Sequence, residues 1–123
     1  MIYLFIGLIE HFIGDYLFQT HWMATEKTKK NFPAFIHAYV YSILFMFLVD
    51  FEFWLIIFIT HFFIDRYRLA VYWIKIINRT ESIENFGYPL EVPKFLSMIL
   101  LFIVDNTFHI IINSICIFYS NNM

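Results

Sequence analysis

Long hydrophobic stretches separated by short polar ones make up most of this chain. A helix needs between about 17 and 25 apolar residues to cross a bilayer, and four stretches meet that length. They run from about Ile2 to Ala24, Pro33 to Val49, Phe53 to Ile77 and Lys94 to Phe118. The pattern predicts an all-α fold, an integral membrane four-helix bundle that forms a single domain over residues 1–123.

Polar residues mark the connections between these predicted helices. The stretch from Asn78 to Pro93 contains Gly87 and Pro89 and should be a loop between the third and fourth helices. All eight basic residues lie on the side of the first and third connections: Lys27, Lys29, Lys30, Arg66, Arg68, Lys75, Arg79 and Lys94. Because basic residues concentrate on the cytoplasmic side of a membrane, that loop should be cytoplasmic and both termini should face outside.

Three of the predicted helices each carry one acid and one histidine four residues apart. The pairs are His11 with Asp15, His61 with Asp65, and Asp105 with His109. Residues at this spacing share one helix face and lie about 6 Å apart along the axis. The order is reversed in the fourth helix, which should run antiparallel to the first and third. The three histidines should therefore lie at one level of the bundle and the three aspartates at another.

Ionisable groups inside a membrane are costly and usually face a partner, an ion or a water-filled cavity. Imidazole and carboxylate groups together suit zinc, manganese or iron, and a site rich in both can hold one or two ions. The sequence therefore predicts a divalent metal site, with a metal-free hydrogen-bonded network as the alternative. The predicted ligands are His11, Asp15, His37, His61, Asp65, Asp105 and His109, and the three aspartates are the catalytic candidates.

His37 is included although it lies only one turn into the second helix, where an interfacial or supporting role is the alternative. Arg68 follows Asp65 by three residues and could bind phosphate, or could extend towards the lipid headgroups. Gln19 follows Asp15 by four residues and could contact the substrate, or could join two helices by a hydrogen bond. Glu10 is turned about 100° from His11, so it could act as a base or face a neighbouring subunit of a homo-oligomer.

The composition argues against an ordinary soluble domain and against a nucleic-acid-binding protein. Hydrophobic residues make up 61% of the chain and charged residues 15%, and the mean hydropathy is +0.69. These values lie outside the balance of an ordinary soluble domain. The formal net charge of -2 gives no sign of a nucleic-acid partner. The expected partners are membrane lipids.

Several segments resemble a known family. They are His11-Phe-Ile-Gly-Asp15-Tyr-Leu-Phe-Gln19-Thr20-His-Trp22-Met-Ala24, His37, His61-Phe-Phe-Ile-Asp65-Arg-Tyr-Arg68 and Asp105-Asn106-Thr-Phe-His109. Together they resemble the phage and bacterial membrane proteins grouped as domain of unknown function 3307, which implies a multi-pass protein of the bacterial inner membrane. The chain departs from that pattern at His21, where an acidic residue is common, and at Asn106, where a glutamine is common.

The pairs are also similar, more distantly, to those of small bacterial membrane proteins described as metal-dependent hydrolases. This likeness and the predicted site favour a membrane-embedded metallohydrolase that acts on a phosphate-containing lipid or lipid-linked substrate. A transport module for metal ions or protons is the first alternative. The second is a phage-encoded interaction protein that modulates a host membrane complex.

Overall fold

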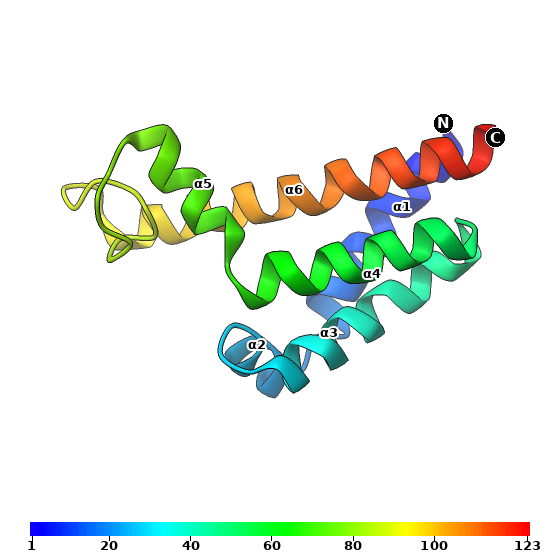
Figure 1. Cartoon of the computed structure of the whole chain (residues 1–123), viewed down its shortest axis with the longest axis horizontal. Helices are drawn as coiled ribbons and strands as arrows, with labels where there is room; N and C mark the ends of the chain where they lie inside the picture. The colour runs from blue at the N-terminus through cyan, green and yellow to red at the C-terminus, as the bar shows by residue number, and fades with distance from the viewer.

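The computed structural model describes residues 1–123 and is entirely helical (Figure 1). It contains six α-helices, a π-helix (η1) and a short 3-10 helix (η2). In chain order these are α1 Ile2–Phe12, η1 Ile13–Leu17, α2 His21–Glu26, α3 Asn31–Ile43, η2 Leu44–Phe47, α4 Phe51–Arg66, α5 Leu69–Asn78 and α6 Lys94–Asn122. The all-α prediction is confirmed. The prediction of four continuous helices is wrong in the first and third regions, because each is broken once.

The first break separates η1 from α2. The Phe18 amide donates to the Ile13 carbonyl at 3.0 Å, five residues back, which is the wider turn of a π-helix. The chain then leaves the helix and restarts at Thr20, whose hydroxyl accepts from the Met23 amide at 3.2 Å. Threonine is a favoured residue at a helix start, because its oxygen satisfies an amide that lacks a helical partner.

The second break falls at Arg68, between α4 and α5. Arg68 adopts the left-handed conformation, with φ 51° and ψ 51°. This conformation costs a non-glycine residue roughly 1–2 kcal/mol, so tertiary contacts must hold it. The Arg68 guanidinium carbon lies 5.3 Å from the centre of the Phe86 ring. Neither glycine nor proline marks this position, and periodicity alone therefore predicted an unbroken helix.

The predicted loop is present between α5 and α6, and hydrogen bonds within the loop hold its conformation. The Asn85 side-chain amide donates to the carbonyls of Pro89 and Val92, both at 2.9 Å. Gly87 has φ 92° and packs so closely on α5 that a Cβ there would lie 2.6 Å from the Val71 carbonyl oxygen. This fixed loop places Phe86 beside Arg68.

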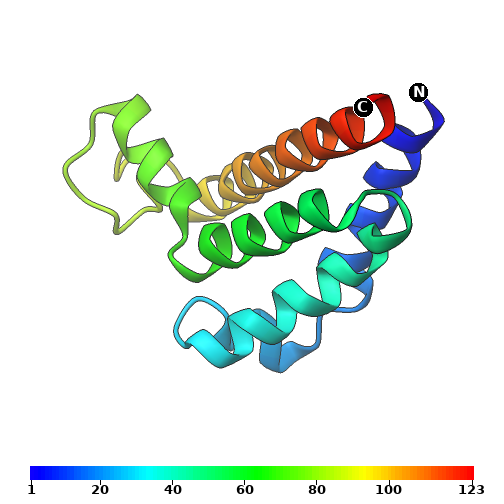
Figure 2. The ribbon, with the colours of Figure 1, turned by 45° about the vertical axis from the view of Figure 1, so that its right-hand side comes forward.

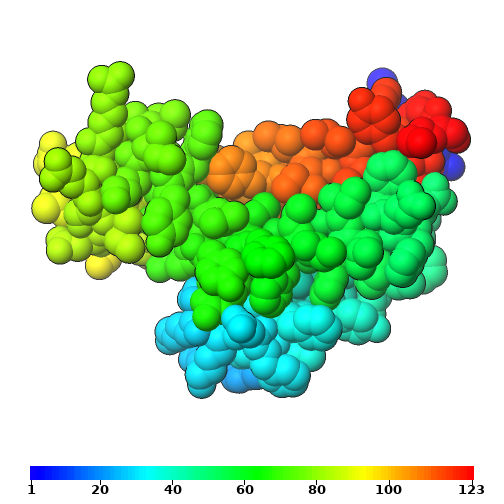
Figure 3. Space-filling model, in the orientation of Figure 1, coloured from blue at the N-terminus to red at the C-terminus, as the bar shows by residue number.

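Both termini lie at one end of the bundle, together with the connection between α3 and α4 (Figures 1 and 2). Short α2 lies towards the opposite end, where α5 and its loop project from the body (Figure 3). Helix α4 lies between α3 and α6, which brings the second, third and fourth predicted regions side by side.

The interior contains two apolar clusters. One includes Tyr41, Phe45, Leu48, Val49, Ile57, Cys116 and Ile117, and the other includes Ala70, Val71, Ile74 and Leu101. Along α6 these clusters are separated by the turn that carries His109, which is 2% exposed. Conversely, many large apolar side chains of α1, α4 and α6 are exposed. A buried polar layer thus lies between two apolar clusters, and many apolar side chains are also exposed on the outside.

Only α6 is long and apolar enough to be a candidate membrane span. It has 29 residues and is about 43 Å long at 1.5 Å per residue. The apolar segments Asn31–Phe47 and Leu69–Asn78 are shorter. The finding supports one candidate membrane-crossing helix.

Candidate metal centre

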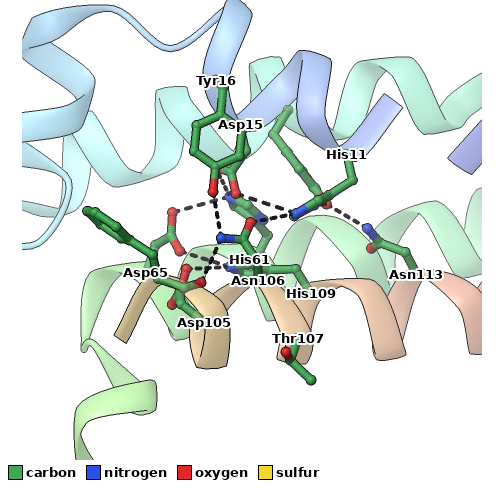
Figure 4. Close-up of polar contacts among 12 residues, drawn as sticks. His11, Asp15, Tyr16, His61, Asp65, Asp105, Asn106, Thr107, His109 and Asn113 are labelled. Atoms are coloured by element: carbon green, nitrogen blue, oxygen red, sulfur yellow. Dashed lines mark hydrogen bonds and ion pairs between the residues drawn. The ribbon is translucent and has the colours of Figure 1, made fainter. Parts of the chain in front are cut away.

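Residues from four elements meet in the buried polar layer (Figure 4). Asp15 comes from η1 and His37 from α3, while the other four residues come in pairs from α4 and α6: His61, Asp65, Asp105 and His109. All are buried except Asp105, which is partly exposed. The four-residue spacing of each pair puts both side chains on the face of its helix that meets the others. Three helices and the π-turn therefore build one site.

The first ligand group consists of Asp15, His37, His61 and Asp65, whose donor atoms all lie within 4.8 Å of one another. His37 Nε2 is 3.1 Å from Asp15 Oδ1 and 3.2 Å from Asp65 Oδ2. His61 Nε2 is 3.2 Å from that same Asp65 oxygen and 3.0 Å from His37 Nε2. His37, which the sequence left between two roles, is thus central to the group.

The second ligand group consists of Asp65, Asp105 and His109. His109 Nε2 lies 3.0 Å from Asp65 Oδ1 and 3.5 Å from Asp105 Oδ2. The two oxygens of Asp65 therefore serve different groups, Oδ2 the first and Oδ1 the second. A carboxylate in this position can join two neighbouring ion sites.

These donor sets fit a divalent ion such as zinc, manganese or iron. Ligands around a tetrahedral ion with bonds of about 2.0–2.2 Å lie roughly 3.3–3.6 Å apart, close to the separations in the first group. Moreover, the Nε2 atoms of His37 and His61 are 3.0 Å apart. Two such nitrogens can hydrogen-bond only if one carries a proton, whereas both lone pairs can face one shared cation.

Ring stacking orients His61. Its ring centre is 3.7 Å from that of Tyr41 and 4.1 Å from that of His109. The Nδ1 atoms of His37 and His61 are buried without a hydrogen-bond partner. Packing between aromatic rings, rather than a second hydrogen bond, therefore fixes the direction in which the His61 Nε2 points.

Lys27 also enters the site, although its sequence position suggested only the end of the first helix. Its Nζ is 2.7 Å from Asp65 Oδ2, 3.3 Å from His37 Nε2 and 3.9 Å from Asp15 Oδ1. Burial alone would lower the pKa of Lys27, but the charges of Asp65 and Asp15 hold it above its ordinary value. A fixed positive charge thus accompanies the two buried carboxylates.

His11 lies beside the ligand groups rather than within them. Its Nε2 is 2.7 Å from Asn106 Oδ1, and its Nδ1 is 2.7 Å from the Tyr41 hydroxyl. Since an amide oxygen only accepts, His11 Nε2 donates and Nδ1 accepts from Tyr41. Asn113 donates to the same hydroxyl at 2.6 Å. Both nitrogens of His11 are therefore engaged in a network that holds α1, α3 and α6 together.

A close backbone approach brings η1 against α3. A Cβ on Gly14 would lie 3.2 Å from the Tyr41 Cα and 3.3 Å from its carbonyl oxygen. Glycine permits this approach, and it sets Asp15, the next residue, next to His37. Sequence reasoning missed the role of Gly14; a glycine inside an apolar helical stretch could have signalled close packing, but not the packing partner.

A cavity of about 520 Å³ opens next to the cluster. Its lining includes all three predicted catalytic aspartates, both predicted substrate-binding residues Arg68 and Gln19, and Lys27. The Gln19 side-chain oxygen is buried without a partner. Apolar side chains of α6, among them Met98, Leu101 and Phe102, form another part of the wall. Glu10 is only half-buried, and His21 is exposed at the start of α2.

Comparison with known proteins gives one match. No curated protein and no solved structure matches the chain. A family model described as protein of unknown function, DUF3307, matches residues 3–123, nearly the whole chain. The chain therefore belongs to the DUF3307 family.

Proposed function

We propose that this protein is a membrane-embedded, metal-dependent hydrolase that acts on a phosphate-containing lipid or lipid-linked substrate. One observation carries the proposal. The cavity of about 520 Å³ joins three carboxylates to two basic side chains, Lys27 and Arg68, and to an apolar wall on α6. Carboxylates and imidazoles suit a metal, cationic side chains suit a phosphate, and apolar residues suit a lipid chain. The three kinds of surface meet in one place.

Each part of the site has a role in this proposal. Asp15, His37, His61 and Asp65 would hold one ion, while Asp105 and His109 with Asp65 offer a second position. A bound divalent ion would polarise the phosphate and lower the pKa of water. The Arg68 side chain lies against the Phe86 ring and makes no hydrogen bond or ion pair within the protein, so its guanidinium nitrogens are available to a phosphate oxygen. The unpaired Gln19 oxygen would accept a hydrogen bond from the substrate or from water.

The distribution of apolar surface supports a location in the membrane. A soluble protein buries apolar side chains and exposes polar ones, whereas this chain has ten buried polar or charged residues and an apolar exterior. We place it in the bacterial inner membrane as a multi-pass protein, with helical regions α1–η1, α3–η2 and α4 crossing beside α6. Both termini would lie outside, and α2, α5 and the loop would lie at the cytoplasmic face.

Cysteine labelling tests this topology. In a Cys116→Ser background, single cysteines at Lys29, Glu84 and Asn122 all lie at exposed positions. We expect a membrane-impermeant maleimide to label Asn122→Cys in spheroplasts. Lys29→Cys and Glu84→Cys should react only after permeabilisation, because the basic end is cytoplasmic. Protection of Asn122→Cys in intact spheroplasts would contradict the proposed orientation.

Phosphate release tests the activity. Purified protein, loaded separately with zinc, manganese or iron, would be incubated with lipid monophosphates, lipid diphosphates and phospholipids in mixed micelles. We expect turnover of at least one of these classes, and none after removal of the ion with a chelator. An absence of turnover with every substrate by each metal-loaded form would contradict the proposal.

The alternative of ion or proton transport rests on the hydrogen-bonded chain that runs from His11 through Tyr41 to Asn113. This chain leads from the cluster towards the terminal end of the bundle. However, the cavity beside His11 and Asn113 has a volume of only about 10 Å³, compared with about 520 Å³ on the other side. Access from one side favours a hydrolase over a transporter.

A further inference from the structure

A second cavity adjoins the one at the candidate metal centre. It has a volume of about 410 Å³ and shares Thr28, Arg68 and Phe86 with the first cavity. It lies among α4, α5 and the loop, at the end of the molecule away from the termini. The shared residues make the two cavities neighbours.

The charges in the second cavity favour an anion. Arg66 and Arg68 contribute two positive charges and Glu84 one negative charge, so the lining is net positive. Arg66 uses its Nε and one terminal nitrogen to donate to the Asn31 side chain and the Thr28 carbonyl, at 2.8 and 3.1 Å. Its other terminal nitrogen has no protein partner. The guanidinium nitrogens of Arg68 have no protein partner, and Arg68 lines both cavities.

The backbone adds to this positive charge. Helix α5 begins at Leu69, and no side chain caps its start. Ala70 lines the first cavity and Val71 the second, so the amino-terminal end of α5 faces the junction between them. Free amide groups and the helix dipole make such an end favourable for anions. The left-handed conformation of Arg68 starts this helix and gives Arg68 its place at the junction.

We propose that the substrate is a lipid diphosphate, with the lipid-proximal phosphate at the candidate metal centre and the distal phosphate in the Arg66–Arg68 cavity. This inference rests on the proposed hydrolase function and narrows its substrate class. The orientation of the substrate follows from the residues that line each cavity. The first cavity carries the apolar side chains of α6 that suit the lipid chain. The second cavity carries the net positive charge that suits a terminal phosphate.

The reaction balances as a hydrolysis. The oxygen of water forms a bond to the lipid-proximal phosphorus, and the bond from that phosphorus to the bridging oxygen breaks. The bridging oxygen keeps the electron pair and leaves as part of inorganic phosphate. Of the two water protons, one goes to the inorganic phosphate and the other to solvent. A lipid diphosphate with three negative charges therefore gives a lipid monophosphate with two, a hydrogen phosphate ion with two, and one free proton. Arg68 would neutralise the charge that develops on the leaving phosphate.

Equilibrium binding of two small anions tests the second phosphate site without requiring turnover. The probes are inorganic phosphate and methylenediphosphonate, a non-hydrolysable diphosphate, with the purified full chain in excess Mn²⁺. We expect methylenediphosphonate to bind at least about tenfold more tightly than phosphate, because its second phosphonate group can form additional charge-assisted hydrogen bonds with Arg68. Arg68→Ala should remove most of this preference, whereas Arg79→Ala, outside both cavities, should retain it.

A second variant keeps both arginines and changes only the acidic residue of the second cavity. Glu84 is exposed and lines only the second cavity. Glu84→Gln removes the opposing charge and should increase the affinity for methylenediphosphonate several-fold while leaving the affinity for phosphate unchanged. Equal affinities for the two anions, or a preference that neither variant alters, would overturn the second phosphate site. If phosphate still binds in that case, the proposed hydrolase function is unaffected. Conversely, an Arg68-dependent preference without lipid turnover would support the second phosphate site but contradict the hydrolase function and, with it, the assignment of a lipid diphosphate substrate.

Discussion

Asp65→Asn should abolish both metal binding and phosphate release while the helical fold persists. The two Asp65 oxygens serve different ligand groups, Oδ2 at 3.2 Å from His37 and His61, and Oδ1 at 3.0 Å from His109. Asparagine nearly preserves the volume but removes the negative charge and replaces one oxygen with an amide donor. A change in a residue that merely orients a ligand costs about 10–100-fold in metal affinity, so loss of this shared ligand should cost more than about 100-fold.

Elemental analysis, phosphate release and circular dichroism of the purified variant check this result. Asp50→Asn is the matched control, because Asp50 lies at the opposite end of α4 and is exposed. The control should keep both metal and turnover. An Asp65→Asn protein that binds metal as well as the unaltered chain would refute the assigned centre. A variant that loses metal yet keeps its effect in cells would favour the interaction-protein alternative.

Lys27→Met should destabilise the metal-free protein strongly and the metal-loaded protein much less. Lys27 is the cation next to the buried carboxylates of Asp65 and Asp15, at 2.7 and 3.9 Å. Removing one partner of a buried ion pair leaves an uncompensated charge and costs roughly 3–5 kcal/mol. A bound divalent ion supplies positive charge in place of the amine. The rise in unfolding temperature on adding metal should therefore be larger for Lys27→Met than for the unaltered chain.

Thermal unfolding of detergent-solubilised protein, with metal and with a chelator, measures this difference. Lys29→Met provides the control, because Lys29 is exposed and pairs only with Glu26 at 3.5 Å. Surface pairs contribute about 0–1 kcal/mol, so the control should unfold like the unaltered chain in both conditions. Equal stability of Lys27→Met and the unaltered protein without metal would show that Lys27 does not balance the buried charge.

Much of the candidate site could be predicted from short-range pattern alone. Residues four apart on a helix share a face by geometry, so the pairs that contain Asp65 and His109 had to present both side chains together. The reversed order in α6 matched an antiparallel helix, and the rings of His61 and His109 stack with their centres 4.1 Å apart, as expected for histidines at one level. The helical class likewise follows from the length and apolar character of the four regions.

The tertiary structure decided the rest, because it depends on contacts between residues far apart in the sequence. The break at Arg68 has no glycine or proline to mark it and is held by packing on Phe86, 18 positions later. Lys27 enters the site because α2 packs on α3 and the turn after α2 reaches the end of α4. His11 hydrogen-bonds to Tyr41 and Asn106 instead of joining the ligand groups. The sequence determined which chemical groups the protein has within its helices. Only the packing of the helices decided which of those groups share an ion site, which support it, and where the cavities open.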